Sequence, residues 1–296
     1  MTAKTILFVC YLCASLLSPA LSECHSKANL VKLEEDVFLR LGQHAVGFEA
    51  DNIANIGFII GQHCVAVIDT GGSYKEGLAL SCAIKKITDK PVCYVINTHA
   101  HPDHILGNLA FKNESTQFIG HANLARAMAI LGSTYLERAS QHVGTQLSAQ
   151  HIVSPDIKVD TSRVIDLGQR KLTLRAHPVA HTDADLTVYD ASHNVLWLGD
   201  LLFMEHVPVI HGSLNGWLQE LTALMHVEFS YVIPGAWPSV ISLAMTDNNL
   251  QPGDVNSALK IVSLSHFYGD FKALDNIELT IYSGQFAVLL GPNGAG

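Results

Sequence analysis

From residue 37 onward, short apolar runs of strand length alternate with Gly, Asp and Asn. The stretch NIGFIIGQHCVAVIDTGGS (55–73) holds two such runs, and Gly61-Gln62 between them predicts a tight hairpin turn. A helix is predicted over residues 75–88, and the apolar run PVCYVIN (91–97) predicts a buried strand after it. Strands and helices therefore alternate, which favours an α/β or mixed-layer fold over an all-β fold.

The same alternation continues to about residue 232. Two helical stretches and three strands are predicted there: helices over 121–130 and 134–142, and strands over 171–175, 186–189 and 195–198. The chain shows no internal repeat and no low-complexity tract.

Both ends of the chain differ from this central part. The start, MTAKTILFVCYLCASLLSPALSE, has one Lys, a short apolar run and small residues, and predicts a signal peptide (1–22) with cleavage after Ser22. The apolar run is too short for a membrane anchor, so we expect a periplasmic or secreted protein with no stable membrane anchor after cleavage. Residues 23–247 would form the main domain, 248–257 (NNLQPGDVNS) a polar linker, and 258–296 a separate fragment.

Composition narrows the choice of function. The net charge is −9, from 27 acidic and 18 basic residues, and no Lys/Arg cluster stands out, so we expect no nucleic-acid partner. Sixteen histidines point toward metal binding, because neutral imidazole is a common metal ligand. Without the signal peptide four cysteines remain, Cys24, Cys64, Cys82 and Cys93, which allow three disulfide pairings or simply pack as small apolar residues.

The motif NTHAHPDH (97–104) is the strongest chemical signal. Alternate histidines on a turning loop can aim two imidazoles at one cation, while the following Asp-His pair points to a second position. Two further segments that end apolar strands, AHTDADL and WLGD, supply more ligand types. Three nitrogen ligands with an open position are typical of catalytic zinc. The candidate metal ligands are His99, His101, Asp103, His104, His181 and Asp200.

With VIDTGG (67–72), THAHPDH, AHTDADL and LGD, residues 37–238 resemble the metallo-β-lactamase superfamily. The resemblance implies an αββα sandwich and one or two Zn²⁺ ions per chain. It also implies a ligand set: the first zinc held by His99, His101 and His181, the second by Asp103 and His104, and both bridged by Asp200.

The resemblance further implies an exported hydrolase that uses metal-bound hydroxide on a small-molecule ester, thioester, lactone or amide. Asp103 would orient the water and take its proton, and Asp200 would fix the bridge. True zinc β-lactamases usually lack the bridging aspartate, so Asp200 argues against an antibiotic-degrading enzyme. The segment 199–221 is similar to the quinoprotein relay zinc metallohydrolases, which implies a quinoprotein dehydrogenase system as partner.

One position departs from the family pattern. The family supplies the last ligand of its second zinc from a His in a PGH turn, and here the turn reads VIPGAWPSV, with Ala236 in that place. His206, His211 and His226 are possible replacements, and the loop residue His211 is the best of them. An impaired domain that only binds a metal or ligand is therefore the alternative function.

Two further patterns suggest other functions: the Asp69-Thr-Gly triplet and the tail from residue 258. Asp69-Thr-Gly resembles half of an aspartic protease dyad, but no second such triplet occurs, and we expect Asp69 to cap a strand-to-helix turn. The tail from residue 258 resembles the first strands of an ABC-transporter ATPase, with Tyr268 placed to stack on adenine and GPNGAG (291–296) opening a phosphate loop. An exported hydrolase and a cytoplasmic ATPase cannot share a compartment, which suggests a fused or frameshifted reading frame and a poorly ordered tail.

Overall fold

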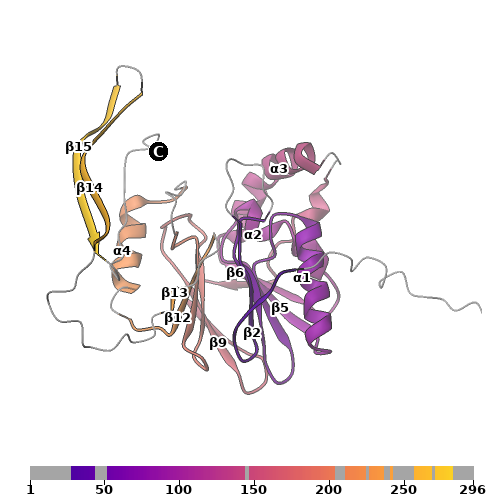
Figure 1. Cartoon of the computed structure of the whole chain (residues 1–296). Coiled ribbons are helices and arrows are strands. Elements are labelled where there is room, and N and C mark those ends of the chain that lie inside the picture. The colour runs from indigo at the N-terminus through magenta and orange to yellow at the C-terminus, as the bar shows by residue number, and fades with distance from the viewer. Residues whose placement is uncertain are drawn as a thin grey trace, which may run out of the picture.

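Two mixed β-sheets lie face to face with helices on their outer sides (Figure 1). The computed structural model describes residues 28–43, 52–143, 147–203, 211–224, 227–236, 241–242, 257–268 and 271–282. The seven-stranded sheet runs in chain order: β1 Val31–Glu34, β2 Val37–Arg40, β3 Ile56–Ile60, β4 Val65–Ile68, β5 Val92–Ile96, β6 Gln117–His121 and β7 Ile157–Val159. From β4 to β7 the neighbours are parallel.

The six-stranded sheet contains the second half of the domain. Its order is β13 Ile241–Ser242, β12 Tyr231–Pro234, β11 Val195–Gly199, β10 Leu186–Asp190, β9 Lys171–Ala176 and β8 Ser162–Asp166. Among the described strands of this sheet, only β11 and β12 pair in parallel. The described helices are α1 Tyr74–Ile87, α2 Pro102–Ile105, α3 Leu124–Val143 and α4 Leu214–Leu224, with 3₁₀ turns η2 Asn108–Phe111 and η3 Ala149–His151. The predicted α/β layering is confirmed.

Strand periodicity explains the layers. On β4, Ala66 and Ile68 belong to the core between the two sheets, whereas Val65 and Val67 pack with Leu80 of α1. Successive side chains of a strand point to opposite faces, so a fully apolar strand has both of its faces covered.

The second sheet is covered in the same way. Trp197 of β11 faces the inter-sheet core, while Leu196 and Leu198 of the same strand pack with Trp217 of α4. The Trp217 indole donates to the Leu201 carbonyl at 2.7 Å, so this large side chain is buried without leaving its N–H unpaired.

Most of the predicted elements are confirmed. The Gly61-Gln62 turn joins β3 to β4, α1 begins and ends within one residue of the predicted helix, and β5, β9, β10 and β11 lie at the predicted strands. The two predicted helices at 121–130 and 134–142 are wrong in detail: His121 ends β6, and a single helix, α3, covers both stretches. Gly132 does not break α3; a Cβ there would lie 3.2 Å from Ile152 Cγ1, so the glycine lets the segment after η3 pack closely.

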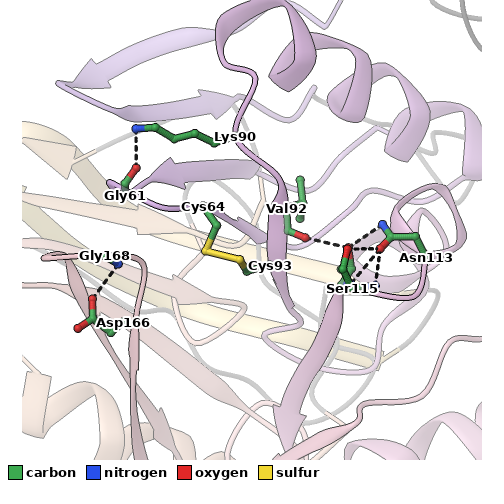
Figure 2. Close-up of a disulfide and its surroundings, with 10 residues drawn as sticks. Gly61, Cys64, Lys90, Val92, Cys93, Asn113, Ser115, Asp166 and Gly168 are labelled. Carbon is green, nitrogen blue, oxygen red and sulfur yellow. Dashed lines mark hydrogen bonds between the residues drawn. A yellow bond between two sulfur atoms is a disulfide. The ribbon is translucent and has the colours of Figure 1, made fainter.

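A disulfide joins the two central parallel strands. Cys64, just before β4, bonds to Cys93 in β5, with their Cα atoms 5.8 Å apart (Figure 2). This selects one bond among the pairings that the cysteine count left open. Disulfides of this kind form and persist in oxidising compartments.

The ends of the chain are described only in part. The predicted signal peptide (1–22) and the phosphate loop (291–296) lie outside the described residues, as does nearly all of the linker. After the linker the structure describes two antiparallel strands, β14 Ser257–Tyr268 and β15 Phe271–Tyr282. The domain boundaries and the ATPase-like fragment stay predictions. Within the described ranges, no helix combines the length and apolar character needed to cross a bilayer.

Candidate metal centre

The candidate metal ligands gather at one edge of the sandwich. His99 and His101 follow β5, Asp200 follows β11, and His181 lies in the loop between β9 and β10. This is the carboxyl-terminal edge of the parallel strands, where α/β proteins place their ligand sites. Gly199 carries a positive φ of 53°, and a Cβ there would lie 2.7 Å from Thr98 Cβ, so a glycine is needed where the two sheets meet at the site.

Four side chains form a compact donor set. One ligand atom each from His99, His101, His181 and Asp200 lies within 4.8 Å of the others. Asp200 Oδ2 is 3.4 Å from His99 Nε2 and 3.3 Å from His181 Nε2, and His181 Nε2 is 3.1 Å from His101 Nδ1. Ligand atoms around a tetrahedral zinc lie about 3.3 Å apart, given bonds of about 2.0–2.1 Å. The spacing therefore fits a tetrahedral cation.

Unpaired polar atoms support the same conclusion. His99 Nε2, His104 Nε2 and Asp200 Oδ1 are buried without a hydrogen-bond partner among the described residues. Buried polar atoms are normally paired, so His99 Nε2 in this set, and His104 Nε2 and Asp200 Oδ1 next to it, indicate places where ligands are missing. The unpaired atoms therefore fit a site that holds a cation.

A second, smaller set lies next to the first. His104 Nε2 is 3.2 Å from Asp200 Oδ1 and 3.3 Å from Asp103 Oδ2. The two oxygens of Asp200 therefore face different donor sets, Oδ2 toward the three histidines and Oδ1 toward His104. This is the placement that a bridging carboxylate requires.

The turn that carries Ala236 lies beside this second set. Ala236 follows β12, is 2% exposed and forms an isolated bridge with Ala54. At the preceding Gly235, a Cβ would lie 1.9 Å from Asp200 Oδ1, so the backbone of this turn contacts the carboxylate. The methyl group of Ala236 has no lone pair, and among the described residues the second set has three donors: Asp103, His104 and Asp200.

His211 is not placed to replace the missing ligand. Its Nδ1 lies 2.7 Å from His101 Nε2, which is the opposite ring nitrogen from the one that faces His181. His206 and His226, the other suggested replacements, lie outside the described residues.

Asp69 has a role that the sequence analysis missed. Its carboxylate accepts from the Thr98 backbone N–H at 2.9 Å and from Thr98 Oγ1 at 2.7 Å, and it lies 2.8 Å from His104 Nδ1. The expected helix-capping role is wrong, because Ser73 caps α1. Asp69 instead orients the His104 ring so that Nε2 faces the carboxylates of Asp103 and Asp200, as partners of metal-binding histidines commonly do.

Changing Asp69 to Asn is expected to destabilise the fold by about 1–3 kcal/mol, because the amide nitrogen cannot accept the hydrogen bonds of Thr98 and His104 and leaves buried donors unpaired. The urea midpoint of unfolding measures this change. Asp89→Asn, at an exposed site after α1, is the matched control and should leave the midpoint within error. Equal midpoints for both variants would show that Asp69 does not hold this loop.

The charges of the site suit a cation. Burial and the neighbouring His104 lower the pKa of His99 well below its usual value, so its ring is neutral. Burial alone would raise the pKa of Asp200, but His104 and His99 outweigh it and hold that pKa well below the usual range. Burial likewise opposes charge on His104, yet Asp103 and Asp200 raise its pKa well above the usual value. Neutral imidazole and ionised carboxylate are the forms that bind metals, so His99 and Asp200 are ready for a cation, whereas His104 must lose its proton when a metal binds the second set.

Comparisons with known proteins agree on the fold. The sequence profile of the Metallo-beta-lactamase superfamily matches residues 50–236. The solved metallo-beta-lactamase from Pontibacter korlensis superimposes with a TM-score of 0.59 at 17% identity, over 72% of this chain and 92% of that one.

Two curated relatives match short segments. A linear primary-alkylsulfatase from a Pseudomonas species is 42% identical over 48 residues, which is 16% of this chain. The spermidine/putrescine import ATP-binding protein PotA of Pseudomonas aeruginosa is 50% identical over 38 residues, or 13% of this chain. The matched segments span 9% and 10% of the lengths of these relatives. The second match gives weak support to a transporter-like fragment.

Proposed function

The chain belongs to the Metallo-beta-lactamase superfamily, and on that premise we propose that it is a zinc-dependent hydrolase of small-molecule esters, thioesters, lactones or amides. The observation that carries the proposal is the donor set of His99, His101, His181 and Asp200, whose ligand atoms lie within 4.8 Å of one another. Zinc held by three imidazoles is a hydrolytic arrangement in proteins, and because the Asp200 carboxylate also faces His104, a zinc there can take a further ligand such as water or substrate.

Asp103 and Asp200 would have separate roles in the hydrolysis. A bound Zn²⁺ supplies an ionised water at neutral pH and polarises the substrate carbonyl. Asp103, ionised because His104 outweighs the effect of burial and keeps its pKa below the usual value, would orient the attacking water and accept its proton at Oδ2. Asp200 would contact the first donor set with Oδ2 and the second with Oδ1, and so fix the position of one set relative to the other.

Three features refine the choice of substrate and partner. The match to an alkylsulfatase adds sulfate esters to the substrates worth testing. The likeness of residues 199–221 to quinoprotein relay metallohydrolases remains the basis for proposing a quinoprotein dehydrogenase system as partner. The net charge of −9 supports a small-molecule substrate and no nucleic acid.

We also propose that the protein is exported to the periplasm or secreted, without a stable membrane anchor after cleavage. The signal-peptide pattern of residues 1–22 supports this, and the Cys64–Cys93 disulfide is typical of an oxidising compartment.

Removal and return of zinc tests the function. Dialysis against a chelator should abolish hydrolysis of a panel of 4-nitrophenyl acetate, a thioester, a lactone and an alkyl sulfate, and added Zn²⁺ should restore it in proportion to occupancy. The same samples report zinc per chain by elemental analysis. Hydrolysis that survives complete zinc removal would refute the proposal.

The alternative function is a metal- or ligand-binding domain with impaired catalysis. The observation in its favour is Ala236, which is buried in the turn whose preceding residue, Gly235, contacts Asp200, and which has no lone pair to offer a second ion. Tight zinc binding without turnover of any substrate in the panel would favour this alternative.

A further inference from the structure

We propose that His211 is a positioning residue that fixes the ring of His101 through a direct hydrogen bond and so sets the metal affinity of the first donor set. This inference rests on the proposed zinc site. Nδ1 of His211 lies 2.7 Å from Nε2 of His101, and the two rings meet edge to face, with centroids 4.8 Å apart and an interplanar angle of 79°.

The backbone holds His211 in this position. Its N–H donates to the carbonyl of His181 at 2.9 Å, and the N–H of Ser213 donates to the carbonyl of Ala180 at 2.8 Å. Gly212 permits this close approach, because a Cβ there would lie 2.3 Å from the Ala180 carbonyl oxygen. His211 therefore contacts two candidate ligands at once, the ring of His101 and the main chain of His181.

The hydrogen bond from His101 to His211 decides which ring nitrogen of His101 carries the proton. Nδ1 of His101 faces His181 Nε2, 3.1 Å away, and the Asp200 carboxylate, so the lone pair must lie on Nδ1 for His101 to bind a cation there. The single proton of neutral His101 then lies on Nε2, where it donates to Nδ1 of His211. A hydrogen-bond acceptor at residue 211 thus selects the binding tautomer and fixes the ring plane.

A matched pair of variants separates the hydrogen bond from the bulk of the side chain. In His211→Asn, the amide Oδ1 occupies the position of His Nδ1 and keeps the acceptor, whereas His211→Leu has a similar shape without an acceptor. The zinc dissociation constant, measured by competition with a chromogenic chelator, should rise about 10- to 100-fold in His211→Leu. It should stay close to that of the parent chain in His211→Asn. Thermal unfolding of the zinc-free proteins checks that both variants fold.

A spectroscopic readout reports the geometry independently of affinity. The visible d–d bands of the Co²⁺-loaded protein should shift in His211→Leu and keep their parent positions in His211→Asn. Equal zinc affinity for parent and His211→Leu would overturn the inference, as would equal losses in both variants, because either result removes the role of the acceptor. A parent chain that binds no zinc is a different result: it overturns the proposed function itself.

Discussion

Replacing His101 with Ala is expected to abolish hydrolysis and to remove zinc from the first donor set. The His101 ring packs against both other histidines of the set, with its centroid 4.6 Å from that of His99 and 4.8 Å from that of His181. Without it, two imidazoles and one carboxylate oxygen remain, and the alanine methyl leaves a gap on the exposed side of the site. Zinc supplies several kcal/mol of transition-state stabilisation, so kcat/KM should fall by at least about 10³-fold.

The measurement combines zinc content with turnover at fixed protein concentration. His63→Ala is a matched control, because His63 is an exposed histidine in the β3–β4 turn, at the opposite end of β4 from the site. It should keep both zinc and activity. A His101→Ala protein that has lost its zinc but still works at the parent rate would rule out metal-dependent hydrolysis.

Local patterning explains how much of the fold could be predicted. The apolar runs of β3 and β4 are fully buried, and the residues Gly61-Gln62 between them require a turn. Burial on both faces follows from such runs without knowledge of the partners. Helix α3 was split in the prediction, because Gly132 is a weak helix former and nothing in the local sequence reveals that Ile152 packs against it.

The candidate metal ligands were predictable for a similar reason, and their supporting contacts were not. His99, His101, Asp103 and His104 lie within one loop, so their nearness follows from chain connectivity. The contact of His211 with His101 spans 110 positions, and that of Asp69 with His104 spans 35. Such pairs depend on how the two sheets meet. Gly212, directly after His211, and the position of Asp69 directly after the buried strand β4 are the signals that could have indicated these two contacts.

Replacing Ala236 with His is expected to raise the zinc content from one ion per chain to two. The turn at Gly235 already contacts Asp200, and the second donor set of Asp103, His104 and Asp200 needs a fourth ligand to close a tetrahedral site. Because the site is buried, the larger ring costs about 1–3 kcal/mol of stability in the zinc-free protein, and zinc binding should recover it.

Ala236→Phe separates ligation from crowding, because phenylalanine fills a comparable volume and offers no lone pair. Elemental analysis and thermal unfolding with and without Zn²⁺ should give two ions and a large zinc-dependent shift for the histidine variant. The phenylalanine variant should show one ion and no added shift. If both variants hold one zinc and unfold alike, the second donor set does not depend on residue 236, and His104 with its carboxylates serves to orient the first site.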